Sequence, residues 1–180
     1  MKGFILGVVV TVVVGALFVY IYFSQGLAPV ATSAQAMPFE KKLANMALKA
    51  RVEKEAPNHP PVAADETNLI AAVDTYKQNC GMCHGVPNQP ITVFANGMFP
   101  KPPQLFRGHG VTDDPPGETY WKVANGIRLT GMPSFKSGLS ETDMWQVTLL
   151  LANADKLPDS VQKKLGGGLQ ANAPGGEHEH

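Results

Sequence analysis

The feature that most constrains this chain is the pentapeptide at residues 80–84, which reads Cys-Gly-Met-Cys-His. Its two cysteines are the only two in the 180-residue sequence. Two thiols separated by two residues can add to the two vinyl groups of one porphyrin, and the adjacent histidine can then bind the iron. The pattern therefore predicts one covalently attached haem c, held by Cys80 and Cys83, with His84 as an axial ligand.

Other uses of a Cys-x-x-Cys pair fit the sequence less well. A thioredoxin-type dithiol follows a strand and begins a helix, whereas these cysteines close a segment with helical spacing. The apolar residues of that segment are Leu69, Ile70, Val73 and Tyr76. A structural zinc site needs four ligands, and no third cysteine exists. The dithiol, zinc and disulfide alternatives therefore rank below haem.

Residues 3–23 carry no charge and are dominated by Val, Leu, Ile and Phe. A helix rising 1.5 Å per residue over this length can cross a hydrocarbon core of roughly 30 Å. We expect residues 1–23 to be a transmembrane anchor with a cytoplasmic amino terminus, because covalent haem attachment fits an exported location for the rest. The alternative is a signal peptide cleaved after the A-x-A site at 34–36, but the apolar run is longer than a usual signal and ends far upstream.

Between the anchor and the haem domain we expect a linker over residues 24–64. Its first part is small and polar, and a helix is predicted over about residues 38–55. One apolar stripe marks that helix, namely Phe39, Leu43, Met46 and Ala50. We expect the stripe to pack on the haem domain or on a neighbouring subunit.

The haem domain is expected over residues 65–165, with helices near residues 67–81, 117–125 and 141–153. Ser140 and Asp143 form a capping-box pattern at the start of the last helix. A loop with seven prolines runs from Pro87 to Pro116, and a loop this long is expected to serve the site. The Gly-rich residues 166–180 are expected to form a disordered tail, with terminal histidines that are solvated.

The second axial ligand decides whether the haem site is closed or open. Met144 lies on the apolar face of a predicted helix, so core packing explains it. Met98 follows His84 by only fourteen residues, and so short a loop would have difficulty passing around the porphyrin. Met132 lies in a Thr-Gly-Met-Pro turn between two helices and is the favoured candidate. His109, between two glycines, is the runner-up.

Four stretches of the sequence resemble the single-haem, class I-like c-type cytochromes, in particular the bacterial membrane-anchored type found as carriers and as cytochrome subunits of respiratory complexes. These stretches are Tyr76-x-x-x-Cys80-x-x-Cys83-His84-Gly85, Pro100-x-Pro102-Pro103-x-Leu105, Asn125-Gly126-Ile127-Arg128-x-Thr130-Gly131-Met132-Pro133 and Leu139-Ser140-x-x-x-Met144-Trp145.

The resemblance implies an all-α cytochrome c fold around one haem, with the first and last helices crossing. It implies Met132 as the distal ligand and a proline carbonyl, from Pro102 or Pro103, that orients His84. Ala72 stands where the family often has Gly, so we expect a slightly wider helix crossing. Beside the resemblance, Trp121, Tyr120 and Arg128 are candidates for the neighbourhood of the haem propionates, although helix packing explains the aromatic residues equally well.

The function expected from these features is single-electron transfer between respiratory or other membrane redox partners, without enzymatic activity of its own. The expected location is a bacterial inner membrane, with the haem domain in the periplasm. The alternatives are a cytochrome subunit of a larger membrane oxidoreductase complex, and a haem enzyme or gas sensor with a labile distal ligand. Fifteen basic and fifteen acidic residues balance, so total charge predicts no electrostatic steering, and nothing indicates nucleic-acid binding.

Overall fold

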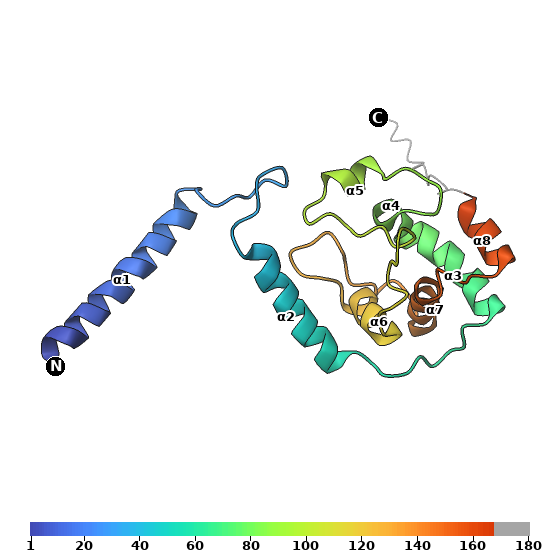
Figure 1. The fold of residues 1–180 in the computed structure, drawn as a ribbon, viewed down its shortest axis with the longest axis horizontal. Helices are drawn as coiled ribbons and strands as arrows, with labels where there is room; N and C mark the ends of the chain where they lie inside the picture. The colour runs from blue at the N-terminus through green and yellow to red at the C-terminus, as the bar shows by residue number, and fades with distance from the viewer. Residues whose placement is uncertain (168–180) are drawn as a thin grey trace, which may run out of the picture. The chain divides into compact units, whose positions relative to one another are not determined.

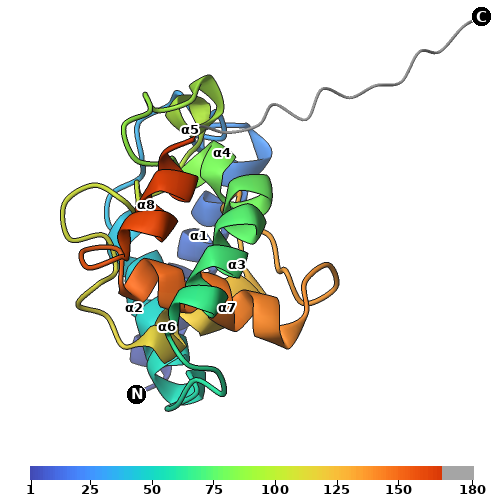
Figure 2. The same cartoon turned by 90° about the vertical axis from the view of Figure 1, so that its right-hand side faces the viewer.

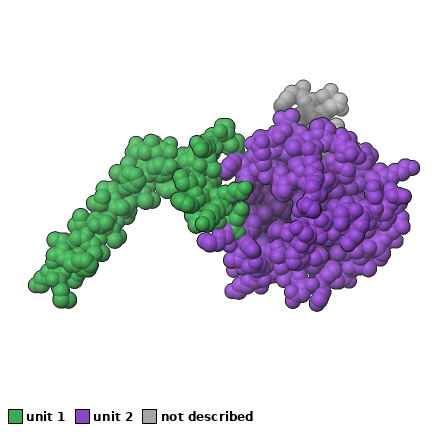
Figure 3. All heavy atoms as spheres, viewed as in Figure 1, with its two compact units in different colours: residues 1–45 green, residues 46–180 purple. Residues whose placement is uncertain are grey.

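The computed structural model describes residues 1–167, and within them the backbone forms eight helices and no strand (Figure 1). The expected all-helical class is thereby confirmed for this part of the chain. The chain divides into two units, residues 1–45 and residues 46–180 (Figure 3). The tail that was expected to be disordered lies, from residue 168 onward, outside the described residues.

The first unit contains α1, Lys2–Ser24, which is the uncharged run expected from the sequence. Its 23 residues correspond to about 35 Å at the helical rise per residue. Within residues 1–167 it is the one helix both long and apolar enough to cross a membrane, and none of its residues is buried. A helix that is apolar on every side is compatible with a membrane anchor.

Helix α2, Glu40–Glu55, begins in the first unit and ends in the second. On the part that lies in the second unit, the stripe residues Met46 and Ala50 are exposed. Val52 is instead only 1% exposed, and Leu48 is half-buried. With 3.6 residues per turn, Val52 lies on the face opposite Ala50. The expectation that this stripe packs on the haem domain is therefore wrong for Met46 and Ala50, because the other face is the buried one, while its packing on a neighbouring subunit stays a prediction.

Contacts at the end of α2 and just after it join this segment to α6, Pro116–Asn125. The Glu55 carboxylate accepts a hydrogen bond from Trp121 Nε1 at 3.1 Å and lies 2.7 Å from the Arg51 guanidinium. A Cβ at Gly117 would overlap the Pro57 carbonyl oxygen, so only glycine permits this close approach. Residues 52–57 are therefore part of the packed second unit.

The main core forms where α3, Glu66–Asn79, packs against α7, Glu141–Ala152 (Figure 2). The two helices share more contacts than any other pair, in agreement with the expected crossing of first and last haem-domain helices. Ala72 is fully buried in α3. The predicted capping box at Ser140 and Asp143 is confirmed, with both of its hydrogen bonds present.

A further helix, α8, Asp159–Gly166, was not predicted from the sequence. It packs on α3, burying Val161 and Leu165, and Lys164 Nζ lies 2.6 Å from Asp74 Oδ2. The apolar residues at 161 and 165 and the proline just before the helix were the available signals. They span only two turns, which is too short for periodicity to be distinctive.

The proline-rich loop after the cysteines contains one short helix, α5, Val93–Gly97. The hydroxyl of Thr92 caps this helix by accepting from the Ala95 N–H at 3.1 Å, and it donates to the Met82 carbonyl at 2.6 Å. Thr92 thus joins the proline-rich loop to the turn that contains the two cysteines. This contact sets where the part of the loop after α5 begins.

Candidate functional site

The second unit contains a cavity of about 220 Å³ with mostly apolar walls. It is lined by the end of α3, by α6 and α7, and by the loops that follow α5 and α6. Five of the residues expected to bind the haem line this one cavity: Cys80, Cys83, His84, Pro103 and Met132. Three segments far apart in the sequence therefore converge on a single site.

The cysteines lie at a tight helical junction. Helix α3 ends at Cys80, whose N–H donates to the Tyr76 carbonyl at 2.8 Å, and one further turn, α4 (Gly81–His84), carries Cys83. Both are free thiols, with Cys80 buried and Cys83 half-buried. Burial, helped by the neighbouring Cys83, raises the pKa of Cys80 to about 12, so this group is a neutral thiol at physiological pH.

The imidazole of His84 is held from one side. Its Nδ1 lies 2.8 Å from the Pro103 carbonyl oxygen, which can only accept, so Nδ1 carries the proton and Nε2 keeps its lone pair. Burial lowers the pKa of His84, and the hydrogen bond to Pro103 opposes this in part. The neutral imidazole is the form that binds a metal. Of the two prolines considered, Pro103 is the one that makes the contact.

The loop that carries Met132 closes on itself through backbone hydrogen bonds. The Ile127 N–H donates to the Met132 carbonyl at 3.1 Å, and the Met132 N–H donates to Thr130 Oγ1 at 3.1 Å. Gly126 begins the loop with φ +68°, and a Cβ there would lie 2.6 Å from the Pro133 carbonyl carbon. Glycine at this position lets the chain turn back toward α6.

Several candidates from the sequence lie away from the cavity lining. Trp121 bonds to Glu55, and Arg128 is exposed on the loop after α6. Tyr120 stacks on Trp145 with ring centroids 4.1 Å apart. Met144 is 4% exposed in a small core cluster with Val123 and Ala124, as core packing predicted, and the runner-up His109 is exposed.

The lining also contains residues that the sequence argument did not select, including Met98, Lys101 and Lys122. The Met98 side chain reaches the cavity and meets Gly131 of the Met132 loop, while the loop-length argument against Met98 as a ligand stays a prediction. Lys122 on α6 lies 3.9 Å from the carboxylates of Asp114 and Glu118. The closely spaced prolines at 100–103 were the available signal for this wall, but they do not reveal which side chains line it.

The donor set tests whether a haem c fits here. Two free thiols, a neutral imidazole with an available Nε2 and a thioether line one apolar cavity, and these are the groups that such a haem requires. An all-helical fold with this site defines a class, and this part of the chain is a cytochrome c domain.

The domain is similar to one known protein family and to a solved structure. Residues 68–150 match the family model described as cytochrome C oxidase, cbb3-type, subunit III. The comparison with curated proteins finds no match. One similar solved structure is a chain of the Kuenenia stuttgartiensis reducing HAO-like protein complex, at 25% identity and a TM-score of 0.47, with 56% of this chain and 49% of that chain covered. The chain thus spans about half the length of that structure.

Proposed function

We propose that this protein is a membrane-anchored cytochrome c that passes single electrons between membrane redox partners. One haem is attached to Cys80 and Cys83, with His84 and Met132 as its axial ligands. The observation that carries the proposal is that these four side chains line one apolar cavity. When bound, the haem supplies an iron that cycles between the ferrous and ferric states.

The residues at this site have different roles in holding the cofactor. Cys80 and Cys83 hold the cofactor covalently, and the Pro103 carbonyl orients the His84 ring through Nδ1. The closed loop from Ile127 to Met132 presents the thioether, which competes with small molecules for the sixth position. The apolar walls limit access of water, which is one of the means by which proteins adjust a reduction potential.

We infer that α1 lies in a bacterial inner membrane, with the amino terminus in the cytoplasm and the haem domain in the periplasm. The length and uncharged composition of α1 support the anchor. The orientation follows from the proposed cofactor, because covalent haem attachment fits an exported location.

A cytochrome subunit fixed in a larger membrane oxidoreductase complex is the second form of this proposal. The matched family model is described as an oxidase subunit, which favours it. The partner would then be permanent, while the chemistry at His84 and Met132 would be the same. Mild detergent extraction distinguishes the two, since a fixed subunit co-purifies with other redox subunits and a carrier elutes alone.

The decisive experiment is the absorbance spectrum of the reduced full-length protein in detergent, before and after carbon monoxide. At a carbon monoxide concentration that fully shifts Met132→Ala, we expect little change for the wild type, whose weak binding is measured at higher concentrations, with the exposed Met46→Ala as the control. The intact mass should exceed that of the polypeptide by one haem. A full shift of the wild type would contradict the closed site, and a Met132→Ala protein that behaves as wild type would assign the ligand elsewhere.

A further inference from the structure

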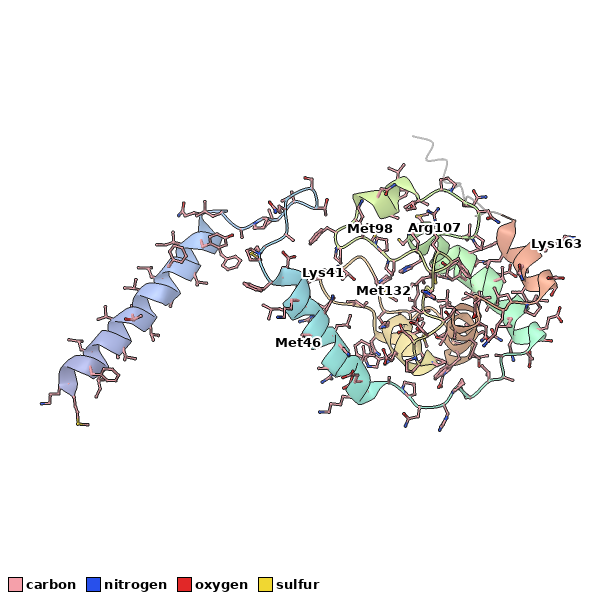
Figure 4. The ribbon with its side chains drawn as sticks, viewed as in Figure 1. Lys41, Met46, Met98, Arg107, Met132 and Lys163 are labelled. Atoms are coloured by element: carbon pink, nitrogen blue, oxygen red, sulfur yellow. The ribbon has the colours of Figure 1, made fainter. Side chains whose placement is uncertain are left out.

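Met98 places a second thioether in the haem cavity, and it contacts the loop that presents Met132. Both side chains line the same cavity, one from the loop after α5 and the other from the loop after α6 (Figure 4). The Cε methyl of Met98 lies directly over Gly131, so that a Cβ at this glycine would overlap it. The residue adjacent to the proposed ligand is therefore covered by a methionine from another segment.

The backbone does not by itself require glycine at position 131. Its φ lies outside the left-handed region, in contrast to Gly126, where φ is +68°. Alanine could therefore adopt the same backbone conformation. A Cβ at 131 would instead meet the Met98 methyl, the movable end of a flexible side chain, which would have to shift away from the loop.

The remainder of the Met132 loop has little packing of this kind at its tip. Leu129 is 93% exposed and has φ +61°, so its side chain contributes no burial. The Thr130 hydroxyl donates to the Ile127 carbonyl at 2.7 Å, which shapes the loop from within. The contact between Met98 and Gly131 ties the loop to a different part of the domain.

We propose that Met98 is a positioning residue for the distal ligand, holding the peptide at Gly131 so that the Met132 thioether stays directed into the cavity. This inference rests on the proposed function, since it takes Met132 as the ligand. An unbranched, polarizable side chain suits the role because it can fill the irregular gap between two loops. Truncating Met98 should therefore loosen the loop that carries Met132 while leaving Met132 itself unchanged.

A double-mutant cycle on the full-length protein tests the contact. Met98→Ala should raise the apparent affinity of the ferrous protein for carbon monoxide about tenfold, equivalent to about 1.4 kcal/mol. Gly131→Ala should do the same, because its Cβ displaces the Met98 methyl. In the double variant the new Cβ fills the vacated space, so the two effects should be less than additive. Met98→Leu should stay near the wild type, and Met46→Ala is the control.

The far-red band of a thioether-ligated ferric haem is the second readout, and it separates this inference from the proposed function. If Met132→Ala removes the band while Met98→Ala and Gly131→Ala change neither readout, the positioning role fails and the ligand assignment stands. Additive effects in the cycle would also overturn the positioning role. If Met98→Ala removes the band and Met132→Ala keeps it, Met98 is the ligand and both proposals fail. If Met98→Ala does not retain haem, the test relies on the Gly131→Ala and Met98→Leu variants.

Discussion

Val52 tests whether the second half of α2 belongs to the haem domain or is only a spacer. Val52→Ala removes two methyl groups from a side chain that is 1% exposed. Their transfer is worth about 1.6 kcal/mol at about 0.8 per carbon, and the cavity left behind adds up to about 1 kcal/mol. The higher helix propensity of alanine offsets about 0.5 kcal/mol. We expect a net loss of about 1–2 kcal/mol in the free energy of unfolding.

The assay is urea unfolding of the full-length haem protein in detergent, followed by tryptophan fluorescence. Both tryptophans lie in the second unit, and Trp121 bonds to Glu55 at the end of α2. With an m-value of about 2 kcal/mol/M, the midpoint should fall by about 0.5–1 M. Met46→Ala, at a 61% exposed position of the same helix, should shift it by no more than about 0.25 M, given surface effects within about 0.5 kcal/mol. Equal midpoints for the two variants would refute the reasoning and reduce α2 to a spacer.

Three further outcomes follow from local geometry. Tyr76→Phe removes a buried hydrogen bond to the Gly85 carbonyl at 2.7 Å and should cost about 1 kcal/mol in urea unfolding. Burial raises the pKa of Tyr76, so wild-type stability should fall as the pH rises above about 10, where the unfolded tyrosine ionises, and this dependence should be weaker in the Phe variant. Gly126→Ala, strained at φ +68° and crowded by Pro133, should increase carbon monoxide binding, whereas Gly138→Ala, with nothing near its Cβ, should not. Asp65→Ala removes the cap that accepts from the Asn68 N–H and should cost about 1 kcal/mol, measured by thermal unfolding.

Local patterns predicted the helices of the haem domain well because each is long, periodic and marked at its ends. Asp65 and Ser140 begin α3 and α7, and Gly126 follows α6. The five-residue attachment pattern predicted the cofactor for a similar reason, since its chemistry depends on adjacent residues. Helix α8 was missed because two turns with two apolar residues resemble an ordinary loop.

Long-range contacts could not be predicted in the same way. Helix α2 has apolar residues on two faces, and periodicity cannot indicate which face finds a partner. The contacts at its end come from Trp121 and Gly117, which lie sixty or more residues away from Glu55 and Pro57. The position of Met98 against Gly131 depends on the path of a proline-rich loop, which has no repeating pattern to follow. In both cases the missing information was tertiary rather than local.

The contacts that join the end of α2 to α6 also limit the freedom of the haem domain. Only residues 25–39 separate α1 from α2, and fifteen residues fully extended span about 50 Å. With α1 in the bilayer, as proposed, the haem domain explores a small volume above it, which corresponds to an effective concentration on the order of millimolar for partners in reach. A redox partner in the same membrane then needs no high affinity, because a contact with a millimolar dissociation constant would already be half occupied.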